Sequence, residues 1–232
     1  MHRAWNKGLT KETHSSVLKI SETMRARKID NFKIWRQHMK NKGRVKSNYP
    51  PLKKSGDLAE LIGVVLGDGY IGKFPRAEVL RIVSNGNNSG FIHRYGRLVG
   101  KVFMKRPYIA KRKKANAVDI TIYEKNISRR LSIPAGARYG QKISVPRWIS
   151  SNRDFAVRYL RGLYEAEGSY NIHEPTSTYK LIFTNRNASL LSNVYNLLSK
   201  LGFHPHTSKD KVQLSRKQEV EKARNLLQFR IY

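Results

Sequence analysis

The stretch LAELIGVVLGDG, residues 58–69, is the most informative part of this chain, because a second version of it follows about a hundred residues later. Residues 155–168 read FAVRYLRGLYEAEG, again an apolar run with a glycine five residues before a carboxylate that is followed by glycine. The glycines are Gly63 and Gly162, and the carboxylates are Asp68 and Glu167. Both copies therefore end on an acid in the same local setting.

Each stretch is expected to form a helix in which the glycine lies about one and a half turns before the acid. A small residue also directly precedes each acid, Gly67 in the first copy and Ala166 in the second. Small residues on facing positions let two helix backbones approach closely. We therefore expect the two helices to pack through Gly63 and Gly162, which would bring the two carboxylates together.

The repeat continues beyond these helices. Residues 82–87 read IVSNGN and residues 182–187 read IFTNRN, a match at an offset of 100. A segment with helical patterning follows each of them and ends in an aromatic residue, Phe103 or Phe203. The chain is therefore interpreted as a duplicated unit of about a hundred residues.

With these residues, the chain from 58 to 232 resembles the LAGLIDADG homing endonucleases in their single-chain, two-motif form. In that family the last acid of each motif binds metal and is catalytic, which implies this role for Asp68 and Glu167. The resemblance places the metal site at these acids and at the residues before them, Gly67 and Ala166. It also implies two four-stranded sheets that form a saddle on DNA, and cleavage of both strands across the minor groove.

Alternation of apolar and polar residues predicts the remaining elements. The strands are expected at 70–74, 78–85, 108–113, 117–124, 169–172, 178–184, 205–209 and 211–215, and the further helices at 88–103, 126–131, 188–201 and 217–229. The predicted fold class is α+β, with two pseudo-symmetric αββαββα halves packed through the two motif helices, each carrying an antiparallel DNA-binding sheet. The domain boundaries are expected at 1–54 for a basic arm and linker, 55–132 for the first half, 133–152 for the linker between halves and 153–232 for the second half.

The composition points to a polyanionic partner. A net charge of +30 over 232 residues, with a pI near 10.6, favours nucleic acid. The basic residues are spread along the chain, which argues against a membrane surface. No apolar run reaches eighteen residues and no secretory signal is present, so a location inside the cell, in the cytoplasm, nucleoid or an organelle, is expected. The internal pseudo-twofold symmetry of the repeat predicts a monomer. Cysteine is absent, which excludes thiol chemistry and Cys-based zinc sites.

The N-terminal arm carries 15 Lys or Arg against 3 Asp or Glu over residues 1–54. Residues 5–13, WNKGLTKET, resemble the nuclease-associated modular motifs that are appended to homing endonucleases and are thought to contact DNA. The alternative is a solvated basic tail with one short helix at 16–28. In either case Tyr49, Pro50 and Pro51 are typical of a stiff linker.

Two other interpretations of these residues are weaker. Residues 67–72 satisfy the G-x-G-x-x-G pattern of a dinucleotide site, but Pro75 follows too soon for a helix to open there. His204 and His206 lack a third ligand, so no zinc is expected.

Paired carboxylates without histidine or cysteine indicate Mg²⁺, or Mn²⁺, as the cofactor. The alternative is that each acid merely ends its helix in a polar turn.

Candidate contacts with double-stranded DNA lie on the strand faces opposite the apolar ones, and at the ends of the two matching strands. They are Lys73, Arg81, Asn85, Asp119, Thr121, Tyr123, Lys180, Asn185, Lys211, Gln213 and Ser215. The resemblance adds Arg186 as a catalytic candidate, because a basic residue near this position in the family lies close to the scissile phosphates. The first half has Gly86 there. The alternative is that Gly86 serves a turn with positive φ and that Lys73 or Arg81 reaches in.

The sequence thus predicts a metal-dependent, site-specific endonuclease of double-stranded DNA. Two alternatives stay open. One is an intron maturase of the same fold that binds RNA, and the other is a DNA-binding protein without cleavage.

Overall fold

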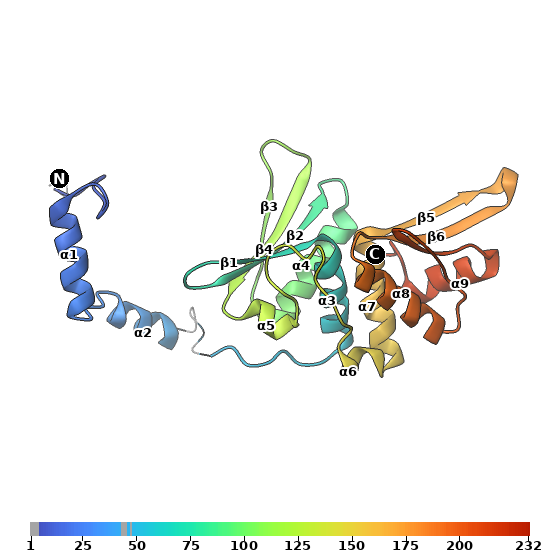
Figure 1. The fold of residues 1–232 in the computed structure, drawn as a ribbon, viewed down its shortest axis with the longest axis horizontal. Helices are drawn as coiled ribbons and strands as arrows, with labels where there is room; N and C mark the ends of the chain where they lie inside the picture. The colour runs from blue at the N-terminus through green and yellow to red at the C-terminus, as the bar shows by residue number, and fades with distance from the viewer. Residues whose placement is uncertain (1–4, 43–45, 47) are drawn as a thin grey trace. The chain divides into compact units, whose positions relative to one another are not determined.

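The computed structural model describes residues 5–42, 46 and 48–232, and the chain divides into two compact units, Met1–Tyr49 and Pro50–Tyr232. The larger unit contains both motif stretches and two four-stranded antiparallel sheets (Figure 1). No helix in the described part of the chain is long and apolar enough to cross a membrane.

The larger unit consists of two successive sets of elements in the same order. The first set is α3 (Gly56–Asp68), β1 (Gly69–Lys73), β2 (Glu78–Asn85), α4 (Ser89–Phe103), β3 (Tyr108–Lys111), β4 (Ala117–Glu124) and α5 (Ile127–Leu131). The second set is α7 (Arg153–Glu167), β5 (Gly168–His173), β6 (Thr178–Thr184), α8 (Ala188–Lys200), β7 (His206–Ser208), β8 (Lys211–Leu214) and α9 (Lys217–Leu227). The predicted αββαββα order is therefore confirmed in both halves.

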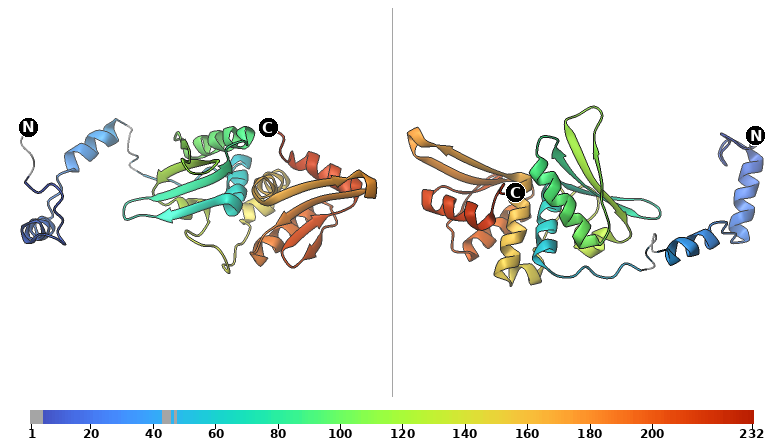
Figure 2. Two further views of the ribbon diagram at one scale, coloured as in Figure 1. Left: turned by 90° about the horizontal axis from the view of Figure 1, so that it is seen from above. Right: turned by 180° about the vertical axis from the view of Figure 1, so that it is seen from behind.

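The sheets have the same strand order, β1-β2-β4-β3 in the first half and β5-β6-β8-β7 in the second. Helices α4 and α5 cover one face of the first sheet, and α8 and α9 cover one face of the second (Figure 2). Helices α3 and α7 lie side by side between the two halves (Figure 1). One continuous apolar core results, running from Leu58 through the paired helices to Phe229.

The two motif helices start in the same way. The side chain of Ser55 accepts a hydrogen bond from the Leu58 amide at 3.2 Å, and that of Asn152 accepts one from Phe155 at 3.0 Å. Such caps satisfy amides that have no partner within the helix, and each contributes about 1 kcal/mol. Both helices are thereby fixed in register at their first turn.

The motif helices end without the left-handed glycine that commonly terminates a helix. Gly69 has φ −91° and ψ 151°, and Gly168 has φ −88° and ψ 151°, so each helix runs directly into an extended strand without a left-handed residue. A Cβ on Gly69 would lie 2.7 Å from the Val65 carbonyl oxygen, and one on Gly168 would lie 2.9 Å from the Tyr164 Cα. Glycine is required here by close approach and not by positive φ.

Close packing of the helices depends on Gly63 and Gly162, as predicted. A Cβ on Gly162 would lie 2.7 Å from the Val64 amide nitrogen and would collide with the Glu60 carbonyl oxygen. A Cβ on Gly63 would collide in the same way with the backbone of α7. The two backbones are therefore in contact at the centre of the core.

Strand pairing corrects the repeat that the sequence suggested. Matching residues 82–87 to 182–187 equates Ile82 with Ile182, but Ile82 pairs with Gly69 and it is Phe183 that pairs with Gly168. The capping residue of the next helix, Asn88, follows Ile82 by six residues, whereas Asn187 follows Phe183 by only four. The strand-to-helix connection is thus two residues shorter in the second half, so the positions of Gly86 and Arg186 are not equivalent.

The segment between the halves contains a helix that was not predicted, α6 (Arg147–Ser150). The rest of the predicted linker at 133–152 is irregular and holds Gly136 and Gly140 at φ +83° and +73°. Its residues pack against the second half, where the Ile143 amide donates to Ser189 Oγ at 2.8 Å and its carbonyl accepts from Asn193 at 2.9 Å. The linker is therefore an ordered part of the core unit.

The smaller unit contains α1 (Ser15–Ala26), close to the predicted helix at 16–28, and a further helix, α2 (Lys33–Asn41), which was not predicted. The Thr13 hydroxyl accepts from the Thr10 amide at 2.9 Å in the turn that precedes α1. Trp5, Phe32 and Trp35 are exposed. The unit therefore presents aromatic side chains together with its many cations.

Candidate active site and DNA-binding face

The two acids terminate the paired helices. Asp68 is the last residue of α3 and Glu167 is the last residue of α7. The small residues before them are in contact, since a Cβ on Gly67 would collide with Ala166 Cβ and would lie 3.1 Å from Glu167 Cγ. The structure therefore brings both acids to the same end of the helix pair.

Electrostatics at this end disfavour two ionised carboxylates. The pKa of Asp68 is raised from 3.8 to about 7, first by partial desolvation of a side chain that still reaches solvent and then by the charge on Glu167. Burial also raises the pKa of Glu167, which is half-buried. Neither carboxylate has an ion pair within the described residues. A cation placed between them would relieve this repulsion.

Arginines hold the backbone at both helix ends. Arg138 Nη2 donates to the carbonyl oxygens of Val65 at 3.0 Å and Gly69 at 2.5 Å, and burial lowers the pKa of Arg138. In the second half, Arg230 Nη2 donates to the Gly168 carbonyl at 3.3 Å. Each arginine compensates the partial negative charge of a helix C-terminus directly beside an acid.

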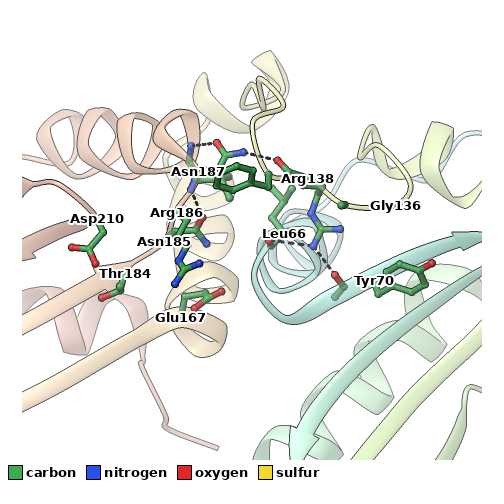
Figure 3. Close-up of a pocket in the computed structure, with 14 residues that line it drawn as sticks. Leu66, Tyr70, Gly136, Arg138, Glu167, Thr184, Asn185, Arg186, Asn187 and Asp210 are labelled. Atoms are coloured by element: carbon green, nitrogen blue, oxygen red, sulfur yellow. Dashed lines mark hydrogen bonds between the residues drawn. The ribbon is translucent and has the colours of Figure 1, made fainter.

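The position of Arg138 is fixed by Asn187, as Figure 3 shows. Asn187 Nδ2 donates to the Arg138 and Gln141 carbonyls, both at 2.9 Å, while its Oδ1 caps α8 by accepting from Ser189 and Leu190. Sequence reasoning missed both residues. The signals that could have found them were an arginine between two glycines in the linker and the N-cap position of Asn187.

A pocket of about 670 Å³ opens beside Glu167. Arg138 and Tyr139 of the linker line one side of it, and Asn185, Arg186 and Asp210 of the second half line the other. In Figure 3 the Arg186 side chain points from its loop toward Glu167. The structure therefore brings Arg186 and Asn185 to the pocket that contains one of the two acids.

The residues present fit a hard divalent cation. Two carboxylates with raised pKa values lie together, and Mg²⁺ is usually held by one or two carboxylates with water and substrate phosphates completing the shell. Among the residues that the structure describes, no group of three or more His, Asp or Glu side chains is placed so that it could hold a metal ion. Asp68 and Glu167, with Gly67 and Ala166 adjacent, are therefore the residues that could hold such a cation.

The uncovered face of the first sheet carries most of the predicted contacts of that half. Register places Arg81 beside Thr121, and both are on the same face as Asp119, Tyr123 and Asn85. Thr121 is only 5% exposed, so its hydroxyl offers little surface to a ligand. Asp119 is held by Arg112 at 2.8 Å and lies 3.9 Å from Arg81.

Lys73 is a correction to the predicted face. It pairs with Glu78 and lies two residues from buried Ile71, so it belongs to the helix-covered side of the sheet. The face also holds two tyrosines that were not predicted. Tyr70 and Tyr108 flank Arg81 and Thr121 in the register and are 50% and 70% exposed. Strand pairing, which is not visible in the sequence, was needed to find them.

In the second sheet, Lys180, Lys211 and Gln213 share the uncovered face, because their neighbours Leu181, Val212 and Leu214 are buried. Ser215 is exposed and lies one residue beyond the end of β8 at Leu214. The pairing adds polar residues to this face that were not predicted. They are Ser169, Asn171 and His206.

Comparison with known proteins supports this architecture. Residues 154–230 match the LAGLIDADG-like domain. No curated protein matches the sequence. Among solved structures, the homing endonuclease I-DmoI in complex with DNA and Mn gives a TM-score of 0.52 at 18% identity, over 74% of this chain and 96% of that chain. The N-terminal LAGLIDADG domain of DUF199/WhiA gives a TM-score of 0.52 at 17% identity, over 79% of this chain and 88% of that chain.

The chain therefore has the LAGLIDADG fold, with two halves around a pair of motif helices. Its second half carries a LAGLIDADG-like domain. The resemblance and the fold class predicted from residues 58–232 are both confirmed.

Proposed function

We propose that this chain is a metal-dependent, site-specific endonuclease of double-stranded DNA. The observation that carries the proposal is the convergence of Asp68 and Glu167 at one end of the helix pair, with raised pKa values, in a chain of net charge +30. Support comes from the fold shared with I-DmoI, which is described as a homing endonuclease in complex with DNA and Mn.

Asp68 and Glu167 would hold the metal, and Gly67 and Ala166 place the backbone of both helices next to it. When bound, Mg²⁺ lowers the pKa of an attacking water and stabilises the leaving oxygen of a phosphodiester. Arg138 and Arg230 keep the acid-bearing turns in place through their carbonyls. Arg186 offers a guanidinium that can neutralise charge on a phosphate in the pocket beside Glu167.

The uncovered sheet faces would bind the duplex. Lys180, Lys211 and Gln213 offer hydrogen bonds from the second sheet, and Arg81 with exposed Tyr123 contacts DNA from the first. Asn85 is the last residue of β2, and Asn185 directly follows β6 and lines the pocket beside Glu167. The arm would add sequence-independent phosphate contacts, with Trp5, Phe32 and Trp35 as apolar contacts.

A DNA-binding protein without cleavage is the second candidate, because one structural neighbour is described as a LAGLIDADG domain and not as an endonuclease. The deciding experiment incubates the full chain with a plasmid library of random target sequences, with Mg²⁺ or with EDTA. Nicked and linear products are expected with Mg²⁺ only. Binding without any cleaved product would overturn the enzymatic assignment.

Variants sharpen the test. Asp68→Asn and Glu167→Gln should abolish cleavage and leave DNA affinity near that of the wild type, because they remove metal charge without changing the sheet faces. Asp154→Asn is the matched control, since Asp154 is exposed at the far end of α7 from Glu167. Equal activity of Asp68→Asn and Asp154→Asn would exclude Asp68 from the metal site.

A further inference from the structure

A second pocket lies along α4, beside the paired helices. It measures about 800 Å³ and is lined by Asp57 of α3, Arg158 of α7 and Arg94, Arg97 and Lys101 of α4. Asp57 stands eleven residues before Asp68 in the same helix, a separation of about 16 Å along the axis. Neither Asp68 nor Glu167, nor any of the predicted residues of the uncovered sheet faces, lines this pocket.

The rim of the pocket is a basic stripe on α4. His93, Arg97 and Lys101 are spaced four residues apart, which places them on one face of the helix, and all three are exposed. Arg97 has no ion pair within the described chain, and Lys101 pairs with Asp57 at 2.5 Å. The stripe therefore presents cationic side chains to solvent.

The floor of the pocket is a rigid set of guanidinium groups. Glu60 is fully buried and accepts from Arg94 Nε at 2.6 Å and Arg94 Nη2 at 2.8 Å, and from Arg158 Nε at 2.5 Å. Arg158 Nη2 also donates to Asp57 at 2.6 Å. An arginine has five N–H donors, so both keep donors that these carboxylates do not use. Buried Glu60 thus fixes the orientation of the Arg94 and Arg158 guanidiniums, and both keep N–H groups that can donate to a ligand.

The charges of the pocket do not cancel. Four Lys or Arg side chains line it, against Asp57 at the rim and Glu60 beneath. The first turn of α4, with Ser89 and Gly90, also lines the pocket and adds the partial positive charge of a helix N-terminus. Fixed arginine guanidiniums beside exposed cationic side chains match the geometry and charge of phosphate oxygens.

We propose that this pocket binds the phosphate backbone of a second segment of duplex DNA, on the face of the protein opposite the sheets. The excess positive charge of the pocket supplies the attraction, and the fixed arginines supply the orientation. The chain would then hold two DNA segments at once. This inference does not depend on cleavage.

Site-directed cross-linking tests the proposal in the full chain. Because the sequence contains no cysteine, His93→Cys gives a single attachment point for a photo-reactive group at the pocket rim. Lys222→Cys is the matched control, an exposed position on α9 that does not line the pocket. Cross-linking to a short duplex of random sequence is expected at position 93 and not at position 222. Equal yields at the two positions would overturn the proposal.

Charge-reversal variants distinguish DNA binding at this pocket from DNA binding at the sheet faces. Arg97→Glu with Lys101→Glu should abolish the cross-link at position 93, while Lys180→Glu with Lys211→Glu on the second sheet should leave it intact. Removal of two phosphate contacts should lower the slope of log affinity against log salt for duplex binding by about 1.8, because each contact contributes about 0.9. Loss of the cross-link only in the sheet variant, or stronger cross-linking to single-stranded RNA than to duplex, would refute the assignment.

Discussion

Arg138 and Gly69 are joined by a hydrogen bond of 2.5 Å from a guanidinium in the interhalf linker to the carbonyl that directly follows Asp68. The second half has a counterpart at 3.3 Å, between Arg230 and Gly168. Each arginine belongs to the segment that follows the last helix of its half, after a left-handed residue, Ser132 or Gln228. In both halves an arginine therefore holds the backbone turn that carries the acid, and the sequence repeat did not reveal this equivalence.

Replacement of Arg138 by Met should lower the free energy of unfolding by about 1.5–3 kcal/mol, because half-buried carbonyls are left without a charged donor. Mg²⁺ binding should weaken as well, since the turn that carries Asp68 is no longer held. Chemical denaturation and the Mg²⁺-induced rise in Tm measure the two effects. Arg129→Met, an exposed position on α5, is the control and should stay within about 0.5 kcal/mol. Normal Mg²⁺ binding by Arg138→Met would limit this arginine to a structural role.

The raised pKa of Asp68 predicts a pH dependence with opposite signs for metal binding and for stability. Mg²⁺ requires the ionised carboxylate, so affinity and cleavage should rise as pH passes through about 7. Without metal, the folded protein holds this proton more tightly than the unfolded chain, whose ordinary pKa is 3.8. Stability should therefore fall as pH rises from about 4 to about 7. Thermal unfolding in EDTA checks this, and Asp68→Asn should flatten the profile; an unchanged slope in that variant would assign the effect to another group.

The helix contact can be tested with glycine substitutions. Helix propensity alone favours alanine over glycine by about 1 kcal/mol. Gly162→Ala should nevertheless destabilise by about 1–3 kcal/mol, because its Cβ would lie 2.7 Å from the Val64 amide nitrogen. Gly100→Ala on α4 is the control, with its Cβ at an ordinary 3.5 Å from Pro107, and should be neutral or stabilising in chemical denaturation. Gly162→Leu should not fold, and a folded, active variant would contradict the interface role.

Local patterns predicted much of the fold because each depends on residues close in sequence. Strand alternation predicted β2, β4 and β6 with the bounds found in the structure, since buried residues such as Ile120 alternate with polar ones. The duplicated motif predicted the pairing of Asp68 with Glu167, because its spacing repeats along the chain.

The features that could not be predicted depend on register and on distant contacts. Lys73 was assigned to the wrong face although it lies two residues after apolar Ile71, and its pairing with Glu78 shows that it belongs to the covered side. Arg138 was missed because it acts on carbonyls about seventy residues earlier in the chain. The sequence match placed Ile82 opposite Ile182, one residue away from its structural counterpart Phe183. Identical residues in the connection after each strand set that match, and the two connections differ in length.

Deletion of residues 1–50 tests the arm. Binding to duplex DNA should weaken, and the slope of log affinity against log salt should fall by about 0.9 for each phosphate that the arm neutralises. Cleavage at the correct site should survive, because the acids and both sheets belong to the unit Pro50–Tyr232. Fluorescence anisotropy over a range of salt concentrations measures the slope. An unchanged slope would make the arm a solvated tail.

The connection between strand and helix differs between the halves in its charge. Arg186 lines the pocket beside Glu167, and the longer connection of the first half has no arginine at the corresponding place. Gly86 does not have positive φ, and a Cβ there would lie 3.3 Å from Asn116 Cγ, so a longer side chain would have to displace Asn116. Lys73 is on the other sheet face, whereas Arg81 is on the uncovered face, 3.9 Å from Asp119.

This asymmetry predicts unequal cleavage of the two DNA strands. A guanidinium near one scissile phosphate stabilises the charge that develops there, and the other phosphate has no such partner from the matching loop. One strand should therefore be cut faster, with a nicked intermediate that accumulates before the double-strand break, and Arg186→Ala should slow the faster cut. Strand-specific end labelling measures both rates, with Arg153→Ala as an exposed control at the start of α7. Equal rates in the wild type, or an Arg186→Ala variant that cuts normally, would show that the asymmetry has no catalytic consequence.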